Sequence, residues 1–286
     1  MQHVEGAGTR LRLPAAGLDL AQTLGCGQSF RWRARADGGF EGCAGARFAR
    51  VKCADGALIV EGPPAPDFEA FWSDYFDLGR DYDALRARFS RVDALAPAVA
   101  YAGGIHLLRQ DGWEALASFI LSQNNNIKRI SGIIERLCTA FGPPCAEGWS
   151  GFPGPERLAS LDVEALAPLR AGFRARYLLD AAQRVCSGEV SLAALETLPL
   201  PEARAMLMQI VGVGRKVADC ALLFGFHRLE SFPVDVWIAR AMAELFPDGL
   251  PPELADCAGV AQQLLFHYRR TGPARAGGGA GTAVAP

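Results

Sequence analysis

IVGVGRKVADCALLFGFHRLESFPVDVWIARAM, residues 210–242, is the stretch from which the rest of the chain can be interpreted. Gly212 and Gly214 predict a tight hairpin, because glycine adopts backbone conformations that other residues avoid. Lys216 then falls in the first turn of a helix, and Asp235 opens a second helix after a short loop. One lysine and one aspartate, each at a helix start, are the best candidate catalytic pair in the sequence.

The neighbours of Lys216 favour a reactive amine. Lys216 and Cys220 share one helix face, and small or apolar residues flank the lysine. Partial desolvation there favours the neutral, nucleophilic amine, whereas a helix N-terminus favours Asp235 as the anion. Taken singly, a snorkelling lysine and an N-cap aspartate are the simpler interpretations. The combination favours attack on a sugar carbon whose leaving base creates positive charge.

The composition is that of an ordinary globular protein. The chain has 286 residues, 50% hydrophobic and 21% charged, enough for a large core or two to three subdomains. Its formal net charge of −2 argues against nucleic-acid binding through a general basic surface. If the protein binds DNA, it must do so through individually placed side chains.

Cysteine usage and hydropathy bear on the compartment. The eight cysteines include no CxxC pair, so buried thiols are expected rather than disulfides or a zinc site. No apolar run approaches the roughly 20 residues of a membrane span, and residues 1–10 lack the apolar core of a secretory signal. We therefore expect an intracellular protein, in a bacterial cytoplasm or nucleoid or a eukaryotic nucleus, without membrane contact.

The N-terminal part predicts a sheet. Residues 10–62 consist of short segments punctuated by glycine, which is typical of antiparallel strands. Gly27, within this region, is most simply part of a turn beside two core aromatics. A proline-rich segment at 63–66 ends the sheet, and from Phe68 onward the apolar spacing is helical. The acidic residues between Glu61 and Asp83 are expected to be a solvated surface.

The rest of the sequence predicts mainly helices. A helix capped by Asp111 precedes three asparagines, 124–126, and a second helix follows up to Gly142. The asparagines could be a cap and turn only, and Arg129 a solvated charge. Residues 143–160 are expected to be a loop. Phe173 and Arg174 could be packing and surface charge, or a DNA wedge beside a base-reading arginine.

These patterns predict an α+β fold. A small antiparallel sheet domain with flanking helices is expected at 1–95, and a mostly helical domain at 96–270. The latter contains the helix-hairpin-helix unit at about 201–226 and the loop of Asp235; its last helix is expected at Glu253 to Arg270. A disordered tail is expected at 271–286, where glycine, alanine and proline dominate.

A helix-hairpin-helix unit can bind duplex DNA without reading its sequence. Gly212 and Gly214 let the main chain approach a ligand closely, and amides at the following helix start suit a backbone phosphate.

The combination resembles the helix-hairpin-helix DNA glycosylases, and more narrowly the eukaryotic-type 8-oxoguanine DNA glycosylases. The resemblance extends from Leu11 to Phe266 and rests on segments in family order: GQSFRW (27–32), YFDL (75–78), GIHLLRQDGWE (104–114), SFILSQNNNIKRISGIIERLCTAFG (118–142), GFRARY (172–177), GVGRKVADC (212–220), PVDV (233–236) and AGVAQQLLF (258–266).

The resemblance implies a reaction and a partner, damaged duplex DNA. Lys216 would attack C1′ of a flipped nucleotide and form a Schiff base, through which β-elimination cuts the strand, with Asp235 stabilising the sugar cation. The family's base pocket maps onto Gly27, Cys220, Gln262 and Phe266. The Gly27 carbonyl would accept from N7–H, which 8-oxoguanine has and guanine lacks. Phe266 would stack on the base, and Gln262 would read its Watson–Crick edge.

Other family positions concern the opposite strand and the backbone. Asn124, Arg129 and Arg174 match residues that contact the orphaned cytosine, so a preference for lesions opposite cytosine is expected. Phe173 replaces a tyrosine wedge, which keeps stacking but loses the hydroxyl. Trp237 replaces a histidine near the active-site phosphate, and Val211 replaces a hairpin proline.

No cofactor is expected, apart from a structural cation that the hairpin carbonyls could hold. Cys257 is the only cysteine after Asp235, so the four-cysteine iron–sulfur cluster of the endonuclease III branch cannot form. A monomer is expected, with no metal-binding residues at the site.

Two alternatives remain. The first is a glycosylase of the same fold acting on another lesion, such as a formamidopyrimidine or an alkylated purine. Lys216 argues against a purely monofunctional version, because monofunctional relatives lack this lysine. The second is a hairpin module that binds DNA without catalysis and has no need of Asp235 or the base pocket.

Overall fold

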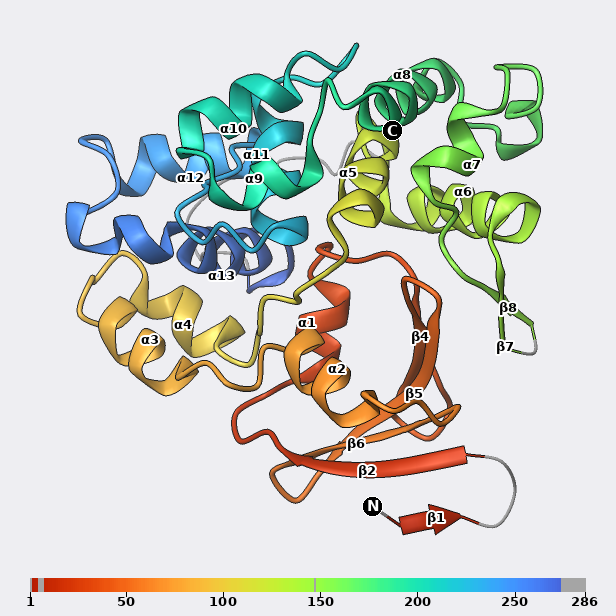
Figure 1. Cartoon of the computed structure of the whole chain (residues 1–286). Helices are drawn as coiled ribbons and strands as arrows, with labels where there is room; N and C mark the ends of the chain where they lie inside the picture. The colour runs from red at the N-terminus through yellow and green to blue at the C-terminus, as the bar shows by residue number, and fades with distance from the viewer. Residues whose placement is uncertain (1, 5–7, 147, 274–286) are drawn as a thin grey trace.

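The computed structural model of the chain describes residues 2–4, 8–146 and 148–273 (Figure 1). The tail expected to be disordered therefore lies, from residue 274 on, outside the described residues. An N-terminal antiparallel sheet is followed by a larger helical part, so the predicted α+β class is confirmed (Figure 1).

The sheet has six strands in the order β1-β2-β6-β5-β4-β3, with antiparallel pairing between all neighbours. Its strands are β1 (Gln2–Val4), β2 (Gly8–Pro14), β3 (Trp32–Ala34), β4 (Phe40–Ala44), β5 (Arg47–Ala54) and β6 (Ala57–Gly62). Alternate residues of β2 are buried, including Leu11 and Leu13, because successive side chains of a strand face opposite sides. Helix α2 (Phe68–Tyr75) contributes Phe68 and Trp72 to the same core.

One helix inside the sheet region was not predicted from the sequence. Helix α1 (Leu20–Gly25) interrupts the segment expected to contain strands only. Asp19 caps it by accepting a hydrogen bond from the Gln22 amide at 3.0 Å, which satisfies one of the free amides at the helix start. The loop that follows α1 contains Gly27, so this helix positions one of the predicted pocket residues.

The helical part contains most of the chain (Figure 1). Its elements are α3 (Tyr82–Phe89), α4 (Ala96–Ala102), α5 (Gly112–Leu121), α6 (Ile127–Phe141), α7 (Pro155–Ala159), η1 (Ala167–Leu169), α8 (Arg174–Ser187), α9 (Leu192–Thr197), α10 (Leu200–Leu207), α11 (Arg215–Gly225), α12 (Val236–Leu245), η2 (Pro252–Cys257) and α13 (Ala258–Thr271). The last predicted helix, Glu253 to Arg270, therefore begins as a 3-10 turn.

The structure corrects the expected loop at 143–160. It contains a short hairpin, β7 (Pro144–Ala146) and β8 (Trp149–Ser150), and then helix α7. Two-residue to three-residue strands carry too little alternating pattern for sequence reasoning to detect them. The hairpin lies beside β4 and β5 and thus joins the helical part to the sheet.

Two hydrophobic cores lie side by side. The smaller one lies between the sheet, α1 and α2 and includes Leu108, and the larger one lies among the helices. Tyr82 and Phe89 of α3 already belong to the larger core. The predicted domain boundary after residue 95 therefore does not coincide with the border between the two cores.

The expectation of a solvated acidic surface between Glu61 and Asp83 is wrong for Asp77. Its carboxylate is buried and accepts hydrogen bonds from Arg80 at 2.5 Å, Tyr82 at 3.0 Å and Arg109 at 2.9 Å. His227 lies 3.4 Å from the same carboxylate. Arg80 and Tyr82 are near neighbours in sequence, but Arg109 and His227 come from distant segments, so the burial of Asp77 could not be predicted from the local pattern.

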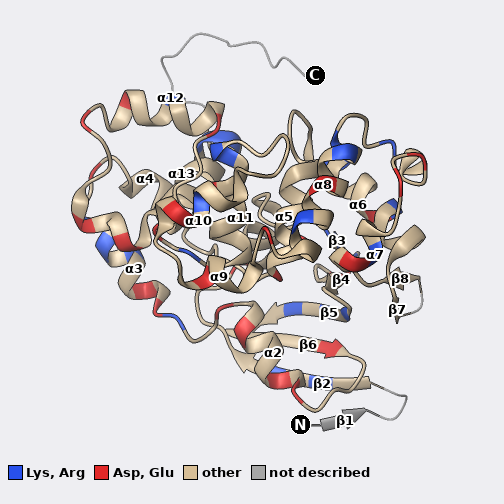
Figure 2. Cartoon of the chain, turned by 45° about the horizontal axis from the view of Figure 1, so that its top comes forward, with Lys and Arg blue, Asp and Glu red and all other residues tan. Residues whose placement is uncertain are grey.

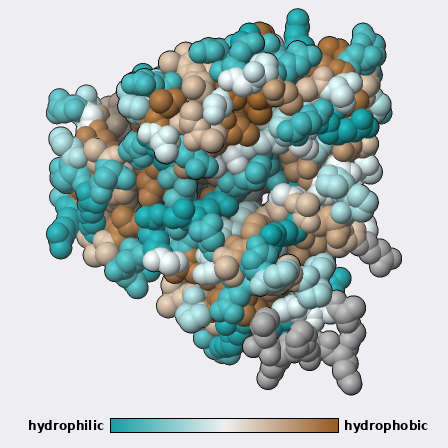
Figure 3. Space-filling view, viewed as in Figure 1, coloured by the Kyte–Doolittle hydropathy of each residue, from teal (hydrophilic) through white to brown (hydrophobic). Residues whose placement is uncertain are grey.

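Charged residues of both signs are spread over sheet and helices (Figure 2). Hydrophilic residues cover most of the face in Figure 3, with smaller hydrophobic patches between them. Among the described helices, none has the length and hydropathy that a membrane crossing requires.

Candidate active site

The glycine hairpin positions Lys216. Gly212 has a positive φ of 78°, and a Cβ there would lie 2.3 Å from the Tyr177 ring, so both its conformation and its surroundings require glycine. Gly214 is the N-cap of α11 in an extended conformation. Lys216 is the second residue of α11, as predicted, and its side chain is half-buried.

Asp235 is the N-cap of α12. Its side chain accepts a hydrogen bond from the Ile238 amide at 2.8 Å, which satisfies one of the free amides at the helix start. The N-cap role weighed as the simple alternative is therefore present. It does not exclude a catalytic one, because a carboxylate has further acceptor sites and this side chain also lines a pocket.

The predicted catalytic pair and the predicted base pocket converge on one cavity of about 330 Å³. Residues from five separate segments line it: Gly27, Phe119, Lys216, Cys220, Phe224, Pro233, Asp235, Gln262, Gln263 and Phe266. All six of the sequence-predicted catalytic and base-pocket residues are among these lining residues.

An aromatic wall supports the lysine. The Nζ of Lys216 lies 5.5 Å from the ring centroid of Phe119, within the range of a cation–π contact. Phe119 stacks on Phe224 with centroids 5.2 Å apart and meets Phe30 edge-on at 5.7 Å. Sequence reasoning missed Phe119 and Phe224 as pocket residues. Phe224 could have been found, because it continues the helix face of Lys216 and Cys220 at a spacing of four.

Polar groups in the pocket differ in how well they are paired. Gln262 is 4% exposed, and its Oε1 has no hydrogen-bond partner among the described residues. Gln263, also buried, donates from Nε2 to the Cys26 carbonyl at 3.1 Å. Burial raises the pKa of the Cys220 thiol, while the charge of Lys216 and a hydrogen bond from it act in the opposite direction. An unpaired buried acceptor is costly, so Gln262 is poised for a ligand that donates to it.

Gly27 forms the opposite wall. Its φ of 86° lies in the left-handed region, and a Cβ would come within 3.4 Å of Ile127 and Arg270. The guanidinium of Arg270 also lies 5.6 Å from the Phe266 ring centroid. Arg270, one helix turn after Phe266, thus adds a positive charge beside the pocket that sequence reasoning did not identify.

The predicted opposite-strand residues lie together at the loop between α5 and α6. Asn124 has a positive φ of 45° and Arg129 is exposed. Asn126 is the N-cap of α6, accepting from the Arg129 amide at 3.0 Å, so one of the three asparagines has the predicted capping role. Phe173 precedes α8 and is exposed, packed edge-on against Tyr177 at 5.5 Å.

Arg174 lies beneath that loop and is only 3% exposed. Its guanidinium donates to the carbonyls of Gln123 at 2.6 Å, Asn124 at 2.7 Å and Ala171 at 3.1 Å. Burial, together with the nearby charge of Arg129, lowers the pKa of Arg174. In this structure Arg174 thus stabilises the conformation of the loop. To contact a base directly, its guanidinium would have to replace one of these hydrogen bonds to a carbonyl with a hydrogen bond to the base.

Trp237 follows Asp235 at the start of α12 and is 46% exposed. Val211, in the hairpin, is also exposed, and its amide donates to Asp180 at 2.7 Å. Trp237 therefore lies at the surface rather than in the core. The phosphate-binding role expected for the hairpin glycines and Trp237 stays a prediction, as does the structural cation at the hairpin carbonyls.

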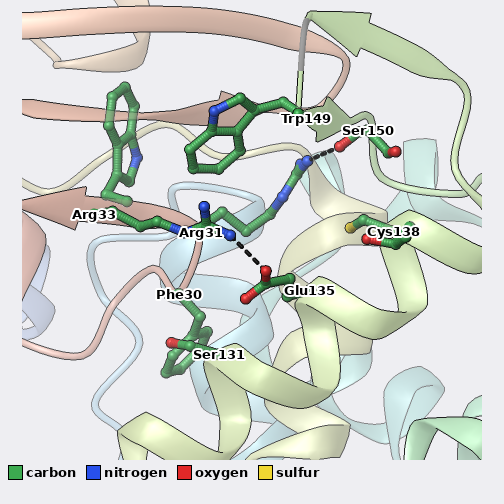
Figure 4. A pocket seen from close by; sticks show the side chains of 11 residues that line it. Phe30, Arg31, Arg33, Ser131, Glu135, Cys138, Trp149 and Ser150 are labelled. Atoms are coloured by element: carbon green, nitrogen blue, oxygen red, sulfur yellow. Dashed lines mark hydrogen bonds and ion pairs between the residues drawn. The ribbon is translucent and has the colours of Figure 1, made fainter.

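A larger cavity, of about 510 Å³, lies elsewhere, between β3, α6 and β8 (Figure 4). There Arg33 pairs with Glu135 at 2.6 Å and lies 4.4 Å from the Trp149 ring centroid. Arg31 donates to the Ser150 carbonyl at 2.5 Å. These charged groups pair with the protein itself, which indicates packing of the β7–β8 hairpin rather than a ligand site.

Within the described part of the chain, no group of three or more His, Cys, Asp or Glu side chains is arranged to hold a metal ion. The side chains that line the Lys216 pocket offer an amine, a carboxylate, a thiol and two amides against aromatic walls.

Two family models match the chain in succession. The model described as 8-oxoguanine DNA glycosylase, N-terminal domain, matches residues 10–116. The model described as HhH-GPD superfamily base excision DNA repair protein matches residues 117–250. The fold is thus of the helix-hairpin-helix base excision repair class.

Solved structures narrow the class. The chain is 42% identical to MBOgg1, solved with a low-affinity DNA ligand, with a TM-score of 0.86 over 94% of this chain and 97% of that one. It is 33% identical to the Clostridium acetobutylicum 8-oxoguanine glycosylase/lyase, solved with duplex DNA containing cytosine opposite 8-oxoguanine. That match has a TM-score of 0.82 and covers 89% of this chain and 92% of the other. The chain belongs to the 8-oxoguanine DNA glycosylase family.

Curated relatives share parts of the chain. An N-glycosylase/DNA lyase of Saccharomyces cerevisiae is 37% identical over 48% of this chain and 40% of its own length. A probable N-glycosylase/DNA lyase of Methanothermobacter thermautotrophicus is 30% identical over 58% of this chain and 63% of its own length. The matches thus span less than two thirds of these relatives.

Proposed function

We propose that the protein is a bifunctional DNA glycosylase and AP lyase that removes 8-oxoguanine from duplex DNA. One observation carries the proposal: the six residues that the family pattern assigns to catalysis and base binding line a single pocket, although they come from distant segments. The unpaired Oε1 of Gln262 in that pocket supports base binding in particular.

In the proposed first step, the damaged nucleotide is rotated out of the duplex so that its base enters the pocket. The neutral amine of Lys216 attacks C1′, while the bond from C1′ to the base breaks and its electron pair leaves with the base, which takes up a proton. The carboxylate of Asp235, at the start of α12, stabilises the positive charge that develops on the sugar.

In the second step, opening of the sugar ring gives a protonated Schiff base between Lys216 and C1′. Loss of a proton from C2′ then expels the 3′ phosphate and cuts the strand. Hydrolysis of the Schiff base returns the lysine. A covalent amine intermediate of this kind lets one residue perform both the glycosylase and the lyase reaction.

Base choice rests on the opposite wall of the pocket. Gly27 would direct its carbonyl at N7–H of 8-oxoguanine, and guanine, which has only a lone pair at N7, would leave that carbonyl unpaired. Gln262 would accept from the Watson–Crick edge, and Phe266 would stack on the ring. The Asn124 loop, with Arg129 and Arg174, would favour cytosine on the opposite strand.

Borohydride trapping tests the reaction. The protein is incubated with an 8-oxoguanine duplex and borohydride, which reduces a Schiff base to a stable amine. We expect a covalent protein–DNA complex, and active enzyme that gives none would rule out the lyase mechanism. Excision opposite each of the four bases tests the pocket and the Asn124 loop together, and the fastest reaction is expected opposite cytosine.

The second candidate is a glycosylase of the same fold that prefers another lesion. One observation favours it: the chain is 28% identical, over 55% of its length, to a putative DNA-3-methyladenine glycosylase of Bacillus subtilis. A panel of duplexes containing 8-oxoguanine, a formamidopyrimidine or 3-methyladenine distinguishes the two. Faster release of 3-methyladenine than of 8-oxoguanine would favour this candidate.

A further inference from the structure

Two cysteines meet where the β7–β8 hairpin lies against the sheet. Cys43 of β4 and Cys145 of β7 are 102 residues apart, yet their Sγ atoms are 3.4 Å from each other. Cys43 is buried, whereas Cys145 is partly exposed and also hydrogen-bonds to the Ala46 carbonyl at 2.9 Å. One thiol is therefore accessible to solvent, and the other lies directly behind it.

The surroundings make the two thiols unequal. The hydrogen bond from Cys43 lowers the pKa of Cys145, and the charge of Arg31 and an amide hydrogen bond from Phe48 act in the same direction. The same contact, together with burial, raises the pKa of Cys43. The accessible sulfur is thus the better thiolate, which is the reactive form, and the buried one remains a thiol.

Arg31 fixes this arrangement. Its guanidinium is buried, pairs with Glu114 at 3.2 Å, and donates to the carbonyls of Gly45 at 2.7 Å and Ser150 at 2.5 Å. Gly45 follows β4, and Ser150 ends β8. One side chain therefore ties the sheet to the hairpin beside both sulfur atoms.

We propose that Cys43 and Cys145 are a redox-active dithiol that hydrogen peroxide converts to an intramolecular disulfide. The Cys145 thiolate attacks one peroxide oxygen, the O–O bond breaks, and the released hydroxide takes up a proton to become water. The sulfur is now a sulfenic acid. Cys43 attacks it, its proton and the sulfenic hydroxyl leave as a second water, and the two thiols have lost two electrons to the peroxide.

The required movement is small. A disulfide has an S–S length of about 2.05 Å, so the sulfurs must approach by roughly 1.4 Å from their present 3.4 Å. Cys145 lies on a three-residue strand of a short hairpin, which can shift more easily than the central sheet. None of these residues lines the Lys216 pocket, so the disulfide should fasten the hairpin to the sheet without blocking the pocket.

The test uses the whole chain. Fully reduced protein is treated with hydrogen peroxide, alkylated and digested without reductant, and the peptides are analysed by mass spectrometry. We expect a peptide pair joined through Cys43 and Cys145, loss of two of the eight thiols, and reversal by dithiothreitol. The Tm should rise by about 5 °C, because the bond closes a long loop in the unfolded chain.

Single-cysteine variants sharpen the test. Cys43→Ser should leave Cys145 as a sulfenic or sulfinic acid without cross-link, and Cys186→Ser, which removes a remote exposed thiol, should cross-link like the parent. Over-oxidation of Cys145 with no joined peptide in the unaltered chain would overturn the proposal, as would a cross-link to Cys138 instead. Both readings come from the unaltered protein, so they do not depend on how well a variant folds.

Discussion

The pocket around Lys216 and the cluster around Asp77 are two groups of charged side chains built in opposite ways. Asp77 is buried with hydrogen bonds from Arg80, Tyr82 and Arg109, and with His227 beside it. In the pocket, Asp235 accepts a hydrogen bond from an amide of its own helix, and the buried Oε1 of Gln262 has no partner among the described residues.

The difference separates stability from function. Fully paired buried charges stabilise the native state only as a set, and removing one partner leaves the others unpaired. Polar groups that are buried without a hydrogen-bond partner reduce the stability of the free protein. A ligand that supplies the missing partners recovers that free energy as binding affinity. The pocket is therefore the place where substitutions should change activity more than stability, and the Asp77 cluster the reverse.

The largest effect is expected for Lys216→Gln. The substitution removes the nucleophile, so excision of 8-oxoguanine and borohydride trapping should both fall by about a thousandfold or more. Arg215→Gln, which changes the neighbouring, mostly exposed residue, is the control and should retain trapping. Base excision by the Lys216 variant at an undiminished rate would show that another group attacks the sugar.

Asp77→Asn should have the next largest effect, and this effect should be on stability rather than on activity. Breaking a buried charge cluster costs about 3–5 kcal/mol, so denaturant unfolding should shift strongly while kcat on 8-oxoguanine DNA changes little. Asp74→Asn is the matched control, because Asp74 lies 3.4 Å from the same Arg109 but is 69% exposed. Equal losses of unfolding free energy in the two variants would mean that the burial of Asp77 contributes little to stability.

The same cluster predicts a pH dependence. Burial alone would raise the pKa of Asp77, but hydrogen bonds and charges from His227, Arg80 and Arg109 outweigh it and hold this pKa well below its usual range. Its stabilising contribution is therefore complete above the unfolded-state pKa of about 4 and is lost as pH falls further. The free energy of unfolding is measured from about pH 5 to about pH 2, a range that brackets the unfolded-state pKa of about 4. With decreasing pH it should fall more steeply for the parent protein than for Asp77→Asn.

Asp235→Asn should lower kcat by about a hundredfold, since it removes a charge that stabilises the transition state. The Tm should change little, because asparagine is also a good N-cap. Asp111→Asn, at the N-cap of α5 where the side chain accepts from Glu114 at 2.8 Å, serves as the control and should retain full activity. Equal loss of kcat in both would point to a general effect of N-cap substitution.

The smallest effect distinguishes two adjacent glutamines. Gln262→Leu should weaken excision by about tenfold through loss of a base contact, with an unchanged or slightly raised Tm because an unpaired buried oxygen is removed. Gln263→Leu removes the hydrogen bond to the Cys26 carbonyl and should lower the Tm instead. A lower Tm for Gln262→Leu would show that its oxygen is paired in solution.

Local chemistry made the pocket residues predictable. Gly212, Lys216 and Asp235 belong to short patterns in which conformation and helix-start chemistry are encoded within a few residues, and Gln262 and Phe266 follow from one helix face. Their assignment to one site came from the family pattern, and the structure brings them to one pocket. Their individual roles stay predictions.

Other features were beyond sequence reasoning. Helix α1 was missed because it lies among strands, and the β7–β8 hairpin because its strands are too short to show a pattern. The three loop carbonyls that surround the Arg174 guanidinium were not predicted, and the contact of Arg174 with the orphaned cytosine stays a prediction. None of these features produces a periodic pattern in the sequence.

The sequence by itself determined the α+β class, the glycine hairpin with its lysine, and the identity of the six pocket residues, because each depends on local conformation or on a short family pattern. Only the tertiary structure decided that Asp77 is buried among partners and that Cys43 lies against Cys145. Burial and pairing are properties of segments brought together from far along the chain, and no local rule of helix, strand or turn specifies which segments will meet.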